Sequence, residues 1–155
     1  MFLIRHATAA AETLTLIDSA RPLTSEGRRQ ARQLGEKLKW YDTALTHVFA
    51  SPLVRAVQTA ELVVAGIDDA PDAVDVMPAL SPERSPREVV AALHKLPASA
   101  SVLLVGHEPS LSSVGGLLLG DAAFGPLDKA EAARIVDGHL RWRFLWSADA
   151  PDPRP

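Results

Sequence analysis

Short runs of apolar residues along the chain indicate buried β-strands. Four of them cover residues 2–5, 47–51, 73–77 and 101–106. The last includes the uninterrupted stretch Val102-Leu103-Leu104-Val105, and continuous runs of this kind are typical of strands covered on both faces. Two further strands are expected at residues 132–136 and 140–146.

Amphipathic patterns predict helices between these strands, over residues 25–40, 52–64 and 86–96 and from Glu108-Pro109 onward. In the second helix Ser51 is placed to cap the first turn, and Pro52 takes the first helical position, where its missing N–H costs nothing. Strands that alternate with helices of this length favour a mainly parallel sheet with helices on both faces. The predicted fold class is therefore α/β.

The size of the chain limits its organisation. It has 155 residues, of which 47% are hydrophobic, which suffices for one well-buried core and is too short for two ordinary domains. We expect one domain over residues 1–146. Residues 147–155 combine three prolines with small and acidic residues. We expect this segment to be a flexible tail that cannot pack or pair as a strand.

Composition makes several classes of partner improbable. The formal charge is −3 and no basic block is present, so nucleic acid is not an expected partner. The apolar run at residues 1–4 is far too short for a membrane span or a signal-peptide core. The chain has no cysteine, which fits a reducing compartment. A cytoplasmic protein without a membrane partner is the expectation.

Side chains that can bind phosphate or act in catalysis follow three of the predicted strands. Arg5-His6 comes at the end of the first strand, Arg55 lies one helical turn beyond the second, and His107 follows the fourth. Ligands of open α/β sheets bind beyond the carboxyl ends of the strands, so these side chains are expected at one edge. Guanidinium groups bind phosphate oxygens, a neutral imidazole can attack phosphorus, and a second imidazole can stabilise the transition state. This scheme requires neither a metal nor a cofactor.

These residues lie in three blocks that resemble the histidine phosphatase superfamily, which includes the phosphoglycerate mutases. Arg5-His6-Ala7 is similar to the family's Arg-His-Gly signature, residues 51–60 to its second block, and Val105-Gly106-His107 to its third. The stretch 18–24, followed by Gly27 and Gln30-Ala31, resembles the short bacterial branch of SixA-type phosphohistidine phosphatases. The resemblance extends from residue 2 to about residue 146.

The resemblance implies a three-layer α/β/α sandwich of the phosphoglycerate mutase type and a metal-independent phosphatase. By it, His6 would be the nucleophile, Arg5 and Arg55 would bind phosphate, and His107 would be the second phosphate-binding histidine. Arg21 is a further candidate for the phosphate pocket. For this branch, the implied substrate is phosphohistidine on a signalling protein.

Two positions depart from the family pattern. Ala7 replaces a glycine, and the added methyl group should matter little if the backbone there is ordinary. Mutases supply a glutamate as general acid from a loop after the second block, where this chain offers Glu83. An imidazole leaving group needs less acid assistance than an alkoxide, so the absence of a clear acid favours phosphohistidine as the substrate.

Two other functions are compatible with the same residues. One is a phosphatase for small phosphate esters, or a mutase-like enzyme, although the chain has no long insertion that could form a lid over a sugar phosphate. The other is a catalytically silent module that binds phosphoproteins. A serine nucleophile is rejected, because Glu108 stands where the Gly-x-Ser-x-Gly pattern of α/β-hydrolases needs serine.

Overall fold

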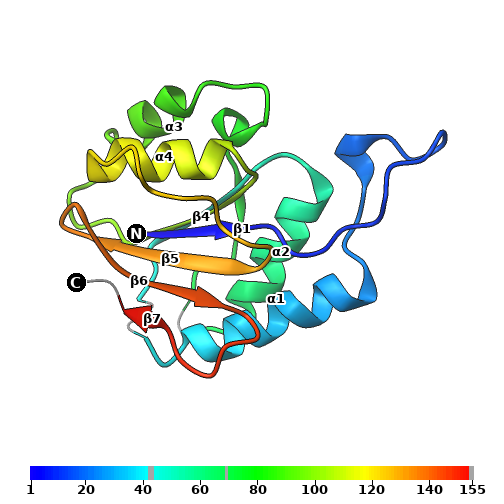
Figure 1. Ribbon diagram of the computed structural model, residues 1–155, viewed down its shortest axis with the longest axis horizontal. Helices are drawn as coiled ribbons and strands as arrows, with labels where there is room; N and C mark the ends of the chain where they lie inside the picture. The colour runs from blue at the N-terminus through cyan, green and yellow to red at the C-terminus, as the bar shows by residue number, and fades with distance from the viewer. Residues whose placement is uncertain (42–43, 69, 154–155) are drawn as a thin grey trace.

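The computed structural model describes residues 1–41, 44–68 and 70–153. Within these residues, a seven-stranded sheet in the order β3-β2-β4-β1-β5-β6-β7 forms the middle of the molecule (Figure 1). The parallel part consists of β1 (Phe2–Arg5), β2 (His47–Ala50), β3 (Asp75–Val76) and β4 (Val102–Gly106). Antiparallel pairs add β5 (Glu131–Val136), β6 (His139–Leu145) and β7 (Asp152–Pro153). The expected α/β class is confirmed.

Helices cover both faces of the sheet. α1 (Ser25–Leu38) and α2 (Val54–Val64) lie on one face, and α3 (Pro86–Leu93) and α4 (Ser110–Leu119) on the other (Figure 1). The alternation of side chains along a strand explains the two cores: Phe2 and Ile4 pack with residues of α1 and α2, whereas Leu3 packs with α3 and α4. No helix in the described part of the chain is long and apolar enough to cross a membrane.

In the described part of the chain, two short 3₁₀ helices complete the fold, η1 (Asp18–Ala20) before α1 and η2 (Pro78–Leu80) after β3. The start of α1 is well defined, because the side chain of Thr24 accepts a hydrogen bond from the Gly27 N–H at 3.0 Å. η1 belongs to the segment between β1 and α1 that projects from the right of Figure 1. Through Asp18 this segment is hydrogen-bonded to Arg55 at the start of α2.

The predicted start of α2 is wrong. The helix begins at Val54 rather than Pro52, and its N-cap is Leu53, whose ψ of 135° is extended. Ser51 does not cap the helix. Its hydroxyl is fully buried and is hydrogen-bonded to Nε2 of His107 at 2.8 Å. It also accepts a longer hydrogen bond, 3.5 Å, from the N–H of Leu53, the residue before the helix.

The expectation that residues 147–155 cannot pair as a strand is also wrong. Asp152–Pro153 form β7, which pairs with Trp142 and Arg143 of β6. Proline is tolerated there because β7 is the last strand of the sheet, where one side of the backbone needs no partner. Residues 154 and 155 lie outside the described residues, and the flexibility of the rest of the tail stays a prediction.

Candidate active site

The register of the parallel strands brings the two predicted histidines together. β1 and β4 are neighbours, with Arg5 opposite Gly106, so His6 and His107 leave adjacent strands at the same edge. Their ring centroids are 5.0 Å apart. Arg55 lies close enough for its charge to lower the pKa of both imidazoles. Three blocks that are distant in sequence therefore meet at one place.

His6 is held in a defined protonation state. Its Nδ1 lies 2.7 Å from the backbone carbonyl oxygen of Ala7. A carbonyl oxygen only accepts, so Nδ1 must carry the hydrogen, and in the neutral ring Nε2 then has a lone pair. Burial lowers the pKa of His6 to about 4, and the charges of Arg55 and Arg5 act in the same direction. At neutral pH the imidazole is therefore uncharged.

The backbone that holds His6 is itself anchored. The Ala7 N–H donates to Oγ1 of Thr59 at 3.1 Å, and Thr59 in turn donates to the carbonyl oxygen of Arg55 at 2.7 Å. Ala7 is fully buried and its φ is not positive, so the methyl group that replaces the family's glycine hydrogen causes no backbone strain. The first and second sequence blocks are thus connected directly beneath the site.

His107 is oriented by a serine that the sequence pattern assigned to a helix cap. Its Nε2 and Oγ of Ser51 are hydrogen-bonded at 2.8 Å, and only 4% of the residue is exposed. Burial lowers the pKa of His107 to about 3, helped by the nearby His6 and Arg55. The signal that could have identified Ser51 is its place at the end of β2, where chemistry-bearing residues are expected.

Asp18 is the second residue whose role sequence reasoning missed. Arg55 donates from Nη1 to its carbonyl oxygen at 2.7 Å and from Nη2 to its Oδ2 at 3.0 Å. Arg21 binds the other carboxylate oxygen, Oδ1, at 2.7 Å. Partial burial opposes ionisation, but the hydrogen bond and charge of Arg55, and then those of Arg21, hold the pKa of Asp18 below its usual value. Arg21 is therefore joined to Arg55 through a shared carboxylate.

This edge also carries polar atoms that are buried and lack a hydrogen-bond partner among the described residues: Nε of Arg5, Arg21 and Arg55, Nδ1 of His107 and Oγ of Ser110. Buried donors without partners are costly, and a group of them is unusual unless a ligand uses it. Guanidinium, imidazole and hydroxyl donors suit a tetrahedral oxyanion such as a phosphoryl group. Within the described residues, no group of three or more His, Asp or Glu side chains could hold a metal ion.

A comparison with known protein families accounts for this geometry. The model of the histidine phosphatase superfamily (branch 1) matches residues 1–82, more than half of the chain. The chain belongs to the histidine phosphatase superfamily. It is 35% identical over 111 residues to the phosphohistidine phosphatase SixA of Escherichia coli (strain K12), a match that covers 70% of this chain and 67% of that protein. The histidine phosphatase described here is thus an enzyme of the SixA-type branch.

Solved structures of two phosphatases share its fold. The protein histidine phosphatase SixA complexed with tungstate has a TM-score of 0.85 and 28% identity, over 94% of this chain and 96% of that one. A phosphoserine phosphatase from Entamoeba histolytica, in complex with 3-phosphoglyceric acid, has a TM-score of 0.64 at 15% identity, over 99% of this chain and 96% of that one. The phosphoglycerate mutase-like sandwich is therefore confirmed.

Glu83, the candidate general acid, lies apart from these contacts. It is an exposed residue of the turn that follows η2. Among the described residues, no hydrogen bond or ion pair connects it to His6, Arg55 or His107. Its role as an acid stays a prediction.

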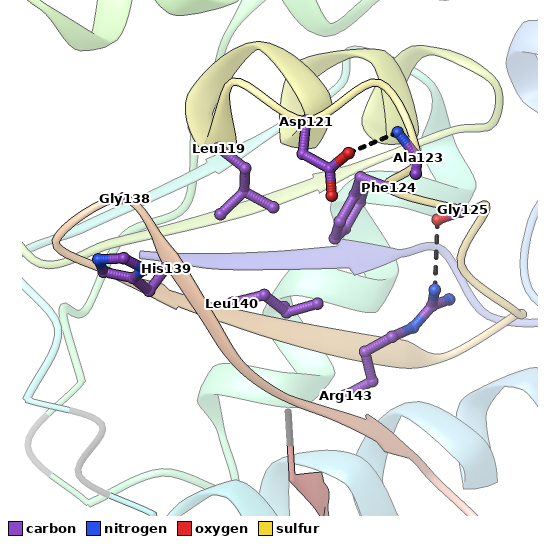
Figure 2. Close-up of a pocket in the computed structure, with 9 residues that line it drawn as sticks. All are labelled: Leu119, Asp121, Ala123, Phe124, Gly125, Gly138, His139, Leu140 and Arg143. Carbon is purple, nitrogen blue, oxygen red and sulfur yellow. Dashed lines mark hydrogen bonds between the residues drawn. The ribbon is translucent and has the colours of Figure 1, made fainter. Parts of the chain in front are cut away.

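A separate cavity of about 540 Å³ lies between the segment after α4 and the β5–β6 hairpin (Figure 2). It is lined by residues such as Phe124, Leu140 and Arg143 and by none of the predicted catalytic residues. Arg143 is already engaged, because it forms an ion pair with Glu131 at 2.7 Å and donates to the carbonyl oxygen of Gly125. Among the described residues that line the cavity, Arg143 is the one Arg or Lys, and its guanidinium already has these partners.

Proposed function

We propose that this histidine phosphatase removes the phosphoryl group from phosphohistidine on a protein, by way of a phosphohistidine intermediate on His6. The observation that carries the proposal is the neutral imidazole of His6, whose Nδ1–H donates a hydrogen bond to the carbonyl oxygen of Ala7. Nε2 is left as the nucleophilic atom beside two arginines. The similarity to SixA supports the choice of substrate.

The reaction proceeds in two displacements. Nε2 of His6 forms a bond to phosphorus while the bond between phosphorus and the substrate's imidazole nitrogen breaks, and the bonding electron pair stays on that nitrogen. The substrate ring reacts with its other nitrogen protonated, so it leaves as neutral imidazole, and the phosphorylated His6 keeps its Nδ1 hydrogen and carries the positive charge. A water molecule then attacks the phosphorylated His6, the Nε2–P bond breaks, and inorganic phosphate leaves. The second displacement regenerates the neutral imidazole, and one proton of the water is released or stays on phosphate.

The surrounding side chains stabilise the charge of the phosphoryl oxygens. Arg5 and Arg55 bind them, and His107 donates to an equatorial oxygen as negative charge develops. Asp18 occupies the Nη1 and Nη2 side of Arg55, which leaves Nε, a buried donor without a partner among the described residues, to face the phosphate. Asp18 is thus a positioning residue. Arg21 contributes by binding the same Asp18 carboxylate as Arg55.

The test compares wild type with His6→Ala on phosphohistidine, phosphoserine and phosphoglycerate. Wild type should favour phosphohistidine and should trap an acid-labile, alkali-stable adduct on His6, whereas His6→Ala should be inactive and folded. His94→Ala, which alters an exposed histidine after α3, is the matched control and should keep full activity. Full activity of His6→Ala would exclude the mechanism. Preference for phosphoglycerate would favour the small-ester function. Binding of phosphohistidine without turnover would favour a catalytically silent module.

Arg55→Ala and His107→Ala test the stabilising roles separately. Each removes a donor that acts mainly in the transition state, so kcat/KM should fall by roughly 10²-fold or more, with kcat carrying most of the loss. Steady-state kinetics on phosphohistidine measure this effect. A change confined to KM would mean that the two side chains only bind the substrate.

A further inference from the structure

Two large apolar side chains are exposed next to the catalytic edge. Leu14 has a relative exposure of 106% and Ile17 of 63%. Both lie in residues 9–20, the segment after β1, which is drawn in blue and projects from the body of the molecule (Figure 1). We name this segment the arm. The other strongly exposed large apolar residues of the described chain lie singly on other elements, at Trp40, Val76 and Leu117. Single exposed residues of that kind are ordinary. Leu14 and Ile17 differ from them in lying three residues apart on one projecting segment.

Hydrogen bonds hold the arm at its base and at its tip. At its base Ala9 forms an antiparallel bridge with Leu23, and the N–H of Ala10 donates to the Pro22 carbonyl oxygen at 2.9 Å. At its tip Thr13 and Leu16 exchange backbone hydrogen bonds of 3.2 and 3.3 Å. The hydroxyl of Thr13 accepts a further bond from the Leu16 N–H at 3.1 Å. Leu14 is therefore presented by a hydrogen-bonded turn, with its side chain in solvent.

The arm is continuous with the phosphate-binding residues. Asp18 directly follows Ile17, and its carboxylate binds Arg55 at 3.0 Å. Arg55 is 4% exposed and His6 is 8% exposed, so the phosphate site is recessed while the tip of the arm stands free. A ligand that contacts both must combine a projecting phosphoryl group with a broad apolar surface around it. A small phosphate ester has no such surface.

We propose that Leu14 and Ile17 form a docking surface for a folded protein that carries phosphohistidine. The inference rests on the proposed function and adds the form in which the substrate is recognised. The partner inserts its phosphoryl group between the arginines and histidines and covers the arm with an apolar patch beside its phosphohistidine. Burial of apolar side chains that are otherwise in water is a main source of favourable free energy in protein association.

The experiment measures kcat/KM on two forms of one substrate. The first is a folded histidine-containing phosphotransfer domain phosphorylated with phosphoramidate, and the second is the isolated peptide that carries its phosphohistidine. The test variant is the double substitution Leu14→Ser with Ile17→Ser, which removes both apolar side chains and leaves the backbone hydrogen bonds of the turn. Leu117→Ser is the matched control, because Leu117 is also exposed, at 42%, and lies on α4.

The double variant should lose about tenfold or more in kcat/KM on the folded domain, because the two apolar side chains that the domain buries are removed, and should stay within about twofold of wild type on the peptide. The control should match wild type on both. Equal losses on domain and peptide would overturn the proposal, because the arm would then act only by holding Arg55. Unchanged activity on the domain, or failure of wild type to accept the domain while it hydrolyses the peptide, would overturn it as well.

The substrate and the oligomeric state of the protein are tested by two further results. If wild type hydrolyses neither form, the proposed function fails rather than the docking surface. Sedimentation of wild type and of the double variant tests whether the arm serves a second copy of this chain. A dimer that disappears in the double variant would overturn the proposal and assign the surface to self-association.

Discussion

Asp18 determines which side of Arg55 is left without a partner at the candidate site. Its carbonyl and carboxylate oxygens bind both terminal nitrogens of the guanidinium, 37 residues away in the sequence. Because only 4% of Arg55 is exposed, this side chain would otherwise be a buried cation with poorly satisfied donors. The carboxylate therefore both neutralises and orients the arginine.

Asp18→Ala should weaken the affinity for inorganic phosphate and lower kcat/KM by about tenfold, because Arg55 loses its fixed orientation. Asp18→Asn keeps one acceptor oxygen and should fall between Asp18→Ala and wild type. Phosphate inhibition constants and phosphohistidine kinetics measure the effect. Glu26→Ala, which removes an exposed ion pair with Arg29, is the control and should behave as wild type. Unchanged phosphate affinity in Asp18→Ala would contradict the positioning role.

At the scale of elements, the close packing of α1 against the segment after β1 supports the site. A Cβ on Gly27 would lie 1.9 Å from the carbonyl oxygen of Thr8, which follows His6 and Ala7 in the chain. The same carbonyl accepts from the Thr24 N–H at 3.0 Å. Glycine is needed at position 27 because the backbone of another segment fills the space that a side chain would take.

Gly27→Ala should lower both stability and activity. The methyl group forces α1 and residue 8 apart, which we expect to cost about 1–3 kcal/mol of unfolding free energy and to shift His6 from its position. Urea unfolding and phosphohistidine kinetics measure the two effects. Arg28→Ala, at an exposed position of the same helix turn, should leave both near wild type. Wild-type activity in Gly27→Ala would mean that the packing of α1 does not position His6.

For the whole molecule, the two buried histidines couple stability to pH. Burial lowers the pKa of His6 from 6.5 to about 4 and that of His107 from 6.5 to about 3. The unfolded chain therefore binds protons more readily than the folded one below pH 6.5. The stability contributed by the neutral imidazoles is complete above that pH. It is lost as the pH falls toward 4 for His6 and toward 3 for His107.

The unfolding free energy should consequently drop more steeply for wild type than for a His6→Asn, His107→Asn variant as the pH is lowered from about 6.5 to about 4.5. The difference in slope should be about 1–2 kcal/mol per pH unit. Urea unfolding at a series of pH values measures it, and NMR titration of the two imidazoles provides an independent check. Parallel curves, or imidazole midpoints near the ordinary value, would contradict the assignment of neutral buried histidines.

Much of the architecture was predictable from local patterns. The apolar runs identified the strands, and the amphipathic segments identified α1 and α3 to within a few residues. The role of Ser51 at the start of α2 was not predictable, because it depends on a buried partner, His107, that is distant in the sequence. The pairing of β7 was not predictable either, because it depends on the free edge of β6. Local propensity contains neither kind of information.

The sequence by itself determined the family, the fold class and the four residues proposed for catalysis, because each of these depends on short motifs and on the rule that ligands bind at the carboxyl ends of strands. Only the tertiary structure decided how those residues are set. The Nδ1 hydrogen of His6 depends on where the Ala7 carbonyl points, and the orientations of Arg55 and His107 depend on Asp18 and Ser51. The contact of Arg55 with Asp18 joins residues 37 positions apart, and that of His107 with Ser51 joins residues 56 positions apart. Both depend on side-chain rotamers and burial in the folded protein, which no periodic pattern of the sequence records.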